Sequence, residues 1–369
     1  MKKQLKVILQ YLSLPDYRRS LFSELSKDTK INFEIVCGKS SPYPFLKNYS
    51  PHKNTNVTYI HNKYFRVGKT TFTWQKHILK TIINRKPNCV IMLGVDPTII
   101  SNFPLFIYLK LMRVKILWWS HGTLGHQGIL GKMFRIFFYR LSDGVLLYNE
   151  DGKQRLINYN IDKHKLFVVG NCINHESYED PSTNLLRKKI KIIFSGRLEH
   201  RKKLEILFQA IKLFKEQKIP VKLDIIGAGP SQDTLKTLVN TNNLEKEITF
   251  HGAVYGKAAD RLISSANVGV IPGLAGLSII HYMARGLPVI TNNNFTEHGP
   301  EISAIHNGKN GYIFEDGNYY DLVEKILLAI KNLEVLSKDA FFTVKKYYSP
   351  EFVNENIIRS IIQVNKSYG

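Results

Sequence analysis

The stretch Lys191–Lys203, KIIFSGRLEHRKK, predicts a buried strand followed by a ligand-binding loop. Its apolar run Ile192–Phe194 is typical of a strand, which Gly196 ends in a turn. The apolar periodicity of Leu204–Phe214 then predicts a helix. In an open α/β sheet, ligands lie off the carboxyl ends of strands, where helix N-termini attract anions. The loop between strand and helix carries cations, among them Arg197, Lys202 and Lys203. It is therefore either a diphosphate site or a solvated basic loop.

The composition indicates a folded two-domain protein with an uneven charge distribution. A chain of 369 residues is longer than one hydrophobic core usually covers. The chain carries 52 Lys and Arg against 30 Asp and Glu, a formal charge of +22. Residues 1–171 hold 27 basic and 9 acidic residues, a net charge of +18, which leaves +4 for residues 172–369. We therefore expect the first half to meet an anionic partner, such as nucleic acid, an acidic membrane surface or a phosphorylated acceptor.

The cysteines and the N-terminus favour a cytoplasmic protein. Cys37, Cys89 and Cys172 are odd in number and far apart, which fits neither a disulfide framework nor a metal site. The apolar part of the N-terminus is short, is broken by Gln10 and lacks a small-residue cleavage site, so a buried first strand is expected rather than a signal peptide.

Strands alternate with helices along both halves, which predicts parallel, doubly wound sheets. Two local predictions in the first half are a helix over Trp74–Ile83 and a helix that begins at Asp96-Pro97. The polar stretch 174–191 is the candidate linker. We expect one domain over residues 1–172, joined by a C-terminal helix at about 349–369, and a second over residues 173–348.

The segment Lys132–Leu141 predicts an amphipathic basic helix. Phe134, Phe137, Phe138 and Leu141 alternate there with three cations, which suits either an anionic membrane surface or a core helix with a solvated basic face.

Four ordered motifs in the second half resemble the retaining glycosyltransferases of family four, also called group 1, of the bacterial surface-polysaccharide type. They are Gly196-Arg197-Leu198 with Lys202, Gly227-Ala228-Gly229-Pro230, Phe250-His251-Gly252, and Gly276-Leu277 through Ile290. The resemblance implies the GT-B fold, in which two Rossmann-like doubly wound domains face each other across a cleft. The second domain would then bind the nucleotide-sugar donor.

The resemblance also implies roles for particular residues. Arg197 and Lys202 match the pair that binds the donor diphosphate, where cations stabilise the charge of the leaving nucleoside diphosphate. His121, at the end of a first-half strand, matches a residue that faces the transferred sugar; the alternative is a turn histidine that caps local backbone. The remaining donor-binding candidates are Gly196, Gly227, Gly229, Gly252, Gly276, Leu277, Ser278 and His281.

The sequence departs from the family pattern at two positions. Gly273 and His281 stand where the family commonly has two glutamates. His281 can still hydrogen-bond a ribose hydroxyl, or it is a helix histidine with a backbone partner. Arg18, in the first loop, is interpreted as a surface arginine, with a phosphate contact as the alternative. The run Glu297–Glu301 is assigned no chemistry.

The expected function is metal-independent, retaining transfer of a hexose from a UDP- or GDP-linked donor, without a cofactor. The acceptor would be a saccharide or a polyprenyl-diphosphate-linked saccharide in capsule, O-antigen or exopolysaccharide biosynthesis. The protein would be cytoplasmic, with its basic domain able to lie peripherally on the inner membrane face. A glycoside hydrolase is disfavoured because no carboxylate pair stands out. Two alternatives remain, a GT-B nucleotide-sugar epimerase and a non-catalytic module that binds sugar nucleotides or nucleic acid. No zinc-finger, RRM or KH signature supports nucleic acid.

Overall fold

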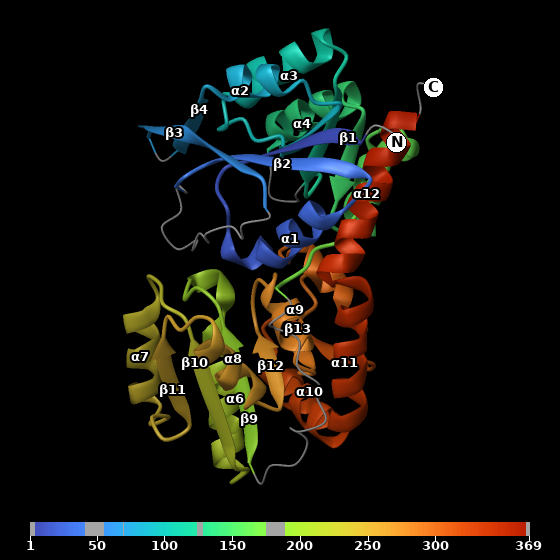
Figure 1. The fold of residues 1–369 in the computed structure, drawn as a ribbon. Helices are drawn as coiled ribbons and strands as arrows, with labels where there is room; N and C mark the ends of the chain where they lie inside the picture. Colours follow the sequence, from blue (N-terminus) through green and yellow to red (C-terminus); the bar gives the residue numbers. More distant parts are fainter. Residues whose placement is uncertain (1–3, 41–54, 69, 124–127, 175–188, 367–369) are drawn as a thin grey trace. The chain divides into compact units, whose positions relative to one another are not determined.

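The computed structural model describes residues 4–40, 55–68, 70–123, 128–174 and 189–366, so most of the expected linker lies outside the described residues. The chain forms two compact units. The N-terminal unit comprises Met1–Asn174 with Ser349–Gly369, and the C-terminal unit comprises His175–Tyr348. Each unit is an α/β structure built on a single sheet (Figure 1).

The sheet of the N-terminal unit has eight strands within the described residues, in the order β4-β3-β2-β1-β5-β6-β7-β8. All neighbouring pairs are parallel except β3 and β4, which form an antiparallel pair at one edge. The strands are β1 (Leu5–Tyr11), β2 (Ile31–Gly38), β3 (Val57–Val67), β4 (Thr70–Lys76), β5 (Cys89–Leu93), β6 (Lys115–Ser120), β7 (Gly144–Leu147) and β8 (Leu166–Val168).

Helices cover both faces of this sheet, because buried strands alternate their side chains between two apolar layers. In β1, Val7 and Leu9 pack into one layer with α1 (Arg19–Lys27) and α12 (Pro350–Lys366). Ile8 packs into the opposite layer, formed with α2 (Ile78–Arg85), α3 (Asn102–Leu111), α4 (Ile129–Leu141) and α5 (Glu150–Asn158). Figure 1 shows α2, α3 and α4 on one side of the sheet and α1 and α12 on the other.

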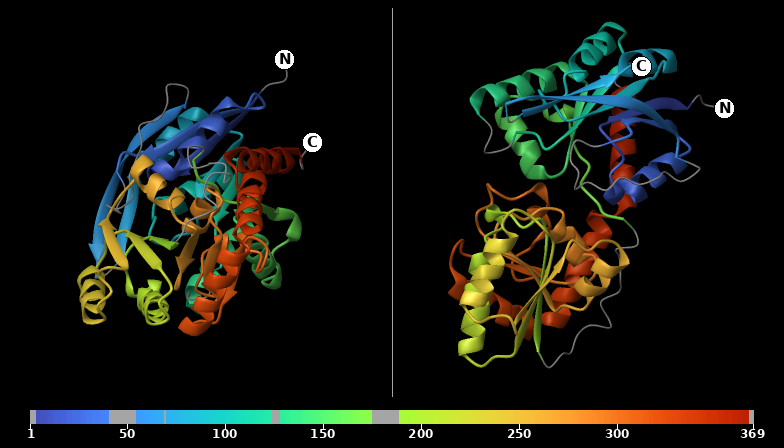
Figure 2. Two further views of the ribbon diagram at one scale, coloured as in Figure 1. Left: turned by 90° about the horizontal axis from the view of Figure 1, so that it is seen from below. Right: turned by 90° about the vertical axis from the view of Figure 1, so that its left-hand side faces the viewer.

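The C-terminal unit has a six-stranded, wholly parallel sheet within the described residues, in the order β11-β10-β9-β12-β13-β14. Figure 2 shows this sheet flanked by helices. Helix α6 (Leu204–Glu216) contacts α7 (Gln232–Thr241) and α10 (Tyr319–Lys331). The strands are β9 (Ile190–Ser195), β10 (Val221–Ile226), β11 (Ile248–Gly252), β12 (Val268–Ile271), β13 (Val289–Asn292) and β14 (Gly311–Phe314). The α-helices are α6 (Leu204–Glu216), α7 (Gln232–Thr241), α8 (Lys257–Ser264), α9 (Ser278–Met283), α10 (Tyr319–Lys331) and α11 (Leu333–Tyr347).

The structure confirms the parallel α/β architecture but corrects two local predictions. The expected helix over Trp74–Ile83 is wrong at its start, because Trp74 lies in β4, which pairs along β3, and α2 begins only at Ile78. Asp96 does not cap a helix, since α3 begins at Asn102. The Asp96 carboxylate instead accepts from the backbone N–H of Thr98 at 2.9 Å, a local turn that satisfies the same side chain.

The three cysteines are buried and unpaired. Burial raises the pKa of the Cys37 thiol to about 12. None of the helices in the described part of the chain is both long and apolar enough to span a membrane.

Candidate functional site in the C-terminal unit

The glycines at the carboxyl ends of β9 and β10 let two loops pack backbone against backbone. Gly227 has φ of +145°, and a Cβ there would overlap the carbonyl oxygen of Gly196. A Cβ at Gly229 would lie 2.7 Å from the nitrogen of Leu198, whose N–H donates to Ala228 O at 3.1 Å. Gly252 accepts from the N–H of Gly227 at 2.7 Å, which links β11 to the same loop. Glycine is thus required at positions 227 and 229 by the close approach of these loops.

The cations that follow β9 are held by a carboxylate that the sequence analysis did not single out. Glu199 accepts from Arg197 Nε at 2.7 Å through one oxygen and from Arg201 Nε at 2.6 Å through the other. Lys202 ends a short 3₁₀ helix, η5 (His200–Lys202), and its Nζ donates to the backbone oxygen of Leu274 at 2.6 Å. Burial, followed by repulsion from Arg201, lowers the pKa of Lys202 to about 8, while Glu199 opposes the shift.

Gly273 packs so closely against η5 that no side chain fits there. A Cβ on Gly273 would collide with the carbonyl oxygen of Arg201 and lie 2.6 Å from the carbonyl carbon of Lys202. The next residue, Leu274, donates its N–H to that Arg201 oxygen at 2.9 Å. The loop after β12 therefore lies directly beside the cationic loop after β9. This packing gives the physical reason for glycine where the family commonly has glutamate.

His298 holds the other side of the loop that follows β12. Its Nδ1 accepts from the N–H of Ala275 at 3.0 Å, and its Nε2 lies 2.9 Å from the backbone oxygen of Asn292. These partners require the neutral tautomer with hydrogen on Nε2, because the carbonyl can only accept. Burial lowers the pKa of His298 and favours this neutral form. Buried Glu301 lies nearby, since its Oε2 is 3.8 Å from the position of a Cβ on Gly276.

His281 lies on α9 and is oriented by Asp260 of α8. Its Nε2 is 3.3 Å from Asp260 Oδ1, and Arg285 Nη2 lies 2.5 Å from the same oxygen. Burial lowers the pKa of His281 although Asp260 opposes the shift, so the ring is neutral at pH 7. With hydrogen on Nε2 directed to Asp260, Nδ1 is left as an acceptor. The half-buried Gly276, Leu277 and Ser278 form the start of the same short helix.

His121 lies in the N-terminal unit, directly after β6. The residue keeps contact with solvent, and its ring centroid is 4.5 Å from that of Tyr148. The surrounding protein atoms desolvate the ring, and this effect together with the charges of Arg18, Arg135 and Arg155 lowers the pKa of His121 to about 4. Neither ring nitrogen has a hydrogen-bond partner among the described residues. The ring therefore makes no hydrogen bond to the described backbone around it, as the alternative interpretation of His121 would require.

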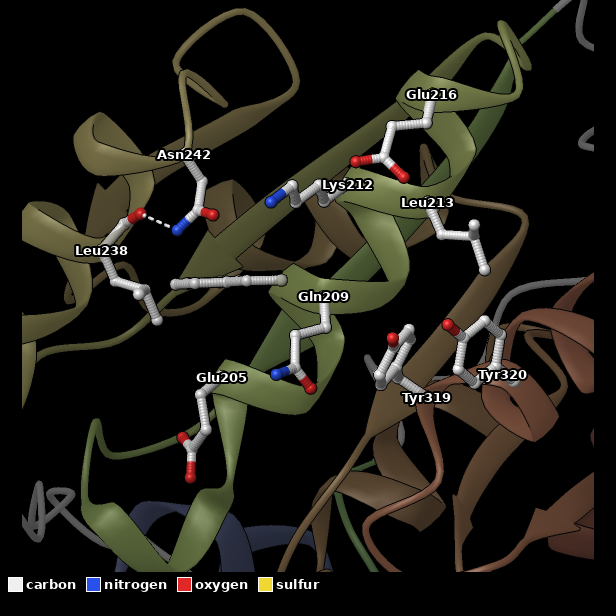
Figure 3. Close-up of a pocket in the computed structure, with 10 residues that line it drawn as sticks. Glu205, Gln209, Lys212, Leu213, Glu216, Leu238, Asn242, Tyr319 and Tyr320 are labelled. Atoms are coloured by element: carbon white, nitrogen blue, oxygen red, sulfur yellow. Dashed lines mark hydrogen bonds between the residues drawn. The ribbon is translucent and has the colours of Figure 1, made fainter.

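A separate pocket of about 370 Å³ lies among α6, α7 and α10 (Figure 3). Its lining includes Glu205, Gln209 and Lys212 from α6, and the stacked pair Tyr319 and Tyr320, whose ring centroids are 4.3 Å apart. None of the residues expected to bind a donor lines it. Because it lies between helices and shares no lining residue with the loops that follow β9, β10, β11 and β12, we distinguish it from the candidate site.

The structure thus brings together the loops after β9, β10, β11 and β12 with the start of α9 at the carboxyl ends of one sheet. Arg197 and Lys202 lie in these loops, while His281 is on α9. Glu199, Asp260 and His298 are the residues that sequence reasoning missed. Of these three, only His298 could have been suspected from the sequence, because it lies in the run Glu297–Glu301, which follows a strand that ends at the same edge of the sheet.

Comparison with known families agrees with this arrangement. Residues 177–339 match the family model of glycosyl transferases group 1. Over 229 residues the chain is 23% identical to a poly(ribitol-phosphate) alpha-N-acetylglucosaminyltransferase of Staphylococcus aureus. The aligned region covers 61% of this chain and 44% of that protein. The chain spans about half the length of the curated relatives that it matches first.

Solved structures share the whole fold. The Anabaena protein HepE, crystallised with UDP, aligns with a TM-score of 0.72 at 14% identity over 97% of this chain and all of that one. The structure of TarM aligns with a TM-score of 0.73 at 13% identity, covering 97% of this chain and 99% of that one. Residues 177–339 therefore match the glycosyl transferases group 1 family, within a chain that has the GT-B fold.

Proposed function

We propose that the protein is a retaining glycosyltransferase that moves a hexose from a nucleoside-diphosphate sugar to a saccharide acceptor in bacterial surface-polysaccharide synthesis. The observation that carries the proposal is the position of Arg197 and Lys202 beside the glycine loops of β10 and β12, at the carboxyl ends of a parallel sheet. The relatives support it by their names, which include enzymes of amylovoran and colanic acid biosynthesis.

In this proposal, the chain's own groups stabilise the leaving nucleoside diphosphate. Breaking the bond between the sugar and the phosphate leaves an additional negative charge on the phosphate oxygen, and fixed cations lower the energy of that transition state. Lys202 is pre-positioned by Leu274 O, and Arg197 by Glu199. Because the pKa of Lys202 is about 8 without a ligand, an approaching diphosphate would raise it and complete the protonation of the ammonium group.

Thermal stabilisation by UDP, GDP, CMP and dTDP tests the donor site. A ligand that binds only the folded state raises its stability by mass action. One nucleoside diphosphate should stabilise the wild type and fail to stabilise the Arg197→Ala/Lys202→Ala variant. Lys212→Ala, which removes an exposed lysine from α6 in the same unit, is the matched control and should respond like the wild type. Stabilisation that persists in the double variant would contradict the proposed diphosphate site.

Product analysis tests the reaction itself. With the stabilising sugar nucleotide and a saccharide acceptor, NMR should show a new glycosidic bond with the anomeric configuration of the donor, with and without EDTA. An epimerised sugar nucleotide in the absence of acceptor would indicate an epimerase. Binding without any turnover of cognate donor and acceptor would indicate a non-catalytic module.

We further propose that α3 and α4 place the basic N-terminal unit on an anionic membrane, where a polyprenyl-diphosphate-linked acceptor would lie. The two helices pack through Phe103 and Phe134, whose ring centroids are 5.2 Å apart. Outside this contact, large apolar side chains are exposed on both helices and on the residues next to them. They are Ile107, Leu111, Met112, Ile129, Leu130, Met133 and Phe137. Exposed cations, Lys110, Arg113 and Arg140, flank them.

An exposed apolar surface rimmed by cations is typical of proteins that bind anionic membrane interfaces. Cosedimentation should detect binding to vesicles with phosphatidylglycerol and much less to neutral vesicles. The Ile129→Ser/Leu130→Ser variant should lose it, while Val335→Ser, an exposed apolar residue of α11, should not. Equal binding to both vesicle types, or none to either, would refute the membrane proposal.

A further inference from the structure

Arg18 is a buried arginine without an acidic partner among the residues that the structure describes. Its side chain belongs to the 3₁₀ helix η1 (Asp16–Arg18), and the residue is 2% exposed, so its interpretation as a surface arginine is wrong. Nη2 donates to the hydroxyl of Tyr148 at 3.1 Å, whereas Nε and Nη1 are buried and have no hydrogen-bond partner in the described part of the chain. No carboxylate of the described residues pairs with it. A buried, unpaired charge is costly, so its retention calls for a ligand or another source of stabilisation.

Aromatic rings supply part of that stabilisation but leave the polar hydrogens unused. The guanidinium carbon lies 4.5 Å from the ring centroid of Trp119, 5.5 Å from that of Tyr17 and 5.6 Å from that of Tyr148. Cation–π contacts act through the faces of the rings and satisfy no N–H group. The indole Nε1 of Trp119 is also buried without a partner. Three donors on two adjacent side chains, Arg18 and Trp119, are thus unsatisfied, and all of them require an acceptor.

This cluster lies where open α/β sheets bind ligands. Arg18 follows β1, Trp119 is near the end of β6, and Tyr148 follows β7, so all three are at the carboxyl end of the sheet. The ring of His121 lies beside that of Tyr148, with the two planes tilted by 39°. Arg135 and Arg155 add positive charge, since both act with Arg18 to lower the pKa of His121. The place is therefore cationic and rich in donors.

We propose that Arg18 and Trp119 bind a phosphate group, and that this phosphate belongs to the acceptor substrate; the second part rests on the proposed transferase function. A phosphate carries up to two negative charges, and its oxygens accept hydrogen bonds from several directions, which matches two guanidinium nitrogens and an indole N–H on different side chains. A carboxylate has a single charge and two oxygens in one plane. The half-buried Tyr17 ring, beside the guanidinium, is the side chain that an entering phosphate would displace.

Inorganic phosphate is the probe, with tryptophan fluorescence as the readout because Trp119 is in the site. The titration uses the full chain carrying Arg197→Ala/Lys202→Ala, so that the proposed donor site does not contribute. Adding Arg18→Met should raise the Kd for phosphate by at least about tenfold, the expected loss of charge-assisted hydrogen bonds. The control is Arg19→Met in place of Arg18→Met, which should leave the Kd unchanged. Arg19 is the neighbouring arginine, and its Nε lies 3.9 Å from Asp16 Oδ1.

Phosphate binding that Arg18→Met leaves intact, or no phosphate binding in the parent protein, would overturn the proposal. Glucuronate binding as tightly as phosphate would overturn the choice of phosphate over carboxylate. If Arg18→Met does not fold, Trp119→Phe, which removes only the indole N–H and part of the ring, should weaken phosphate binding measured by isothermal titration calorimetry, since the fluorescent reporter is then absent; an unchanged affinity would refute the site. The nucleoside diphosphate that stabilises the wild type should stabilise an otherwise wild-type Arg18→Met protein equally. If none of UDP, GDP, CMP and dTDP stabilises the wild type, the donor site of the transferase proposal is refuted and the phosphate site still stands.

Discussion

Substituting Gly273 by alanine should disturb the donor loops through backbone overlap. The new Cβ would lie 2.6 and 2.8 Å from the carbonyl carbon and Cα of Lys202. Non-bonded carbon atoms prefer about 3.5–4.0 Å, so the loop must move by roughly 1 Å. That shift breaks the hydrogen bond of 2.9 Å from Leu274 N to Arg201 O. Overpacking costs about 1–3 kcal/mol and a lost hydrogen bond about 0.5–1.5 kcal/mol, which together destabilise the C-terminal unit by roughly 1.5–4.5 kcal/mol.

Differential scanning calorimetry measures this cost. For a unit of this size each kcal/mol shifts Tm by about 2–4 °C, so the expected decrease is roughly 3–18 °C. Gly276→Ala is the matched control in the same loop. The atom nearest to a Cβ at position 276 would be Glu301 Oε2 at 3.8 Å, which is an ordinary contact distance. Its Tm should stay within about 2 °C of wild type, as for an uncrowded surface change. If Gly273→Ala unfolds at the same temperature as Gly276→Ala, the backbone-crowding explanation for glycine at this position is wrong.

Three further predictions concern the histidines. His298 is neutral in the folded state, with a pKa below 6.5, so its contribution to stability is present above pH 6.5 and is lost as the pH falls below that value. The difference in the free energy of unfolding between wild type and His298→Gln, measured in urea, should show this loss. A difference that does not depend on pH would contradict it. Asp260→Asn should disturb the orientation of the His281 ring and weaken binding of a nucleoside diphosphate while binding of its 2′,3′-dideoxy analogue changes less; equal losses for both would argue against a ribose contact. His121 should titrate near pH 4 by NMR, and Arg155→Met should raise that pKa toward 6.5; an unshifted value would show that Arg155 does not act on the ring.

The sequence by itself determined the architecture and the place of the candidate site. Short apolar runs ended by glycine, alternating with helical periodicity, predict parallel strands and their order along the chain, because both signals depend on residues close together in sequence. The run KIIFSGRLEHRKK therefore predicted β9, the cationic loop and α6. The same local logic failed at Trp74, where pairing with β3 overrides the apolar helical pattern.

Only the tertiary structure decided which partners fix the site. Asp260 of α8 meets His281 of α9, and His298 holds Ala275 across 23 residues of chain. Arg18 likewise meets Tyr148 across 130 residues, and it is buried although arginines are usually exposed. Nothing local distinguishes these side chains from ordinary polar residues, because hydrogen bonds and burial depend on which strand ends the fold brings to one edge.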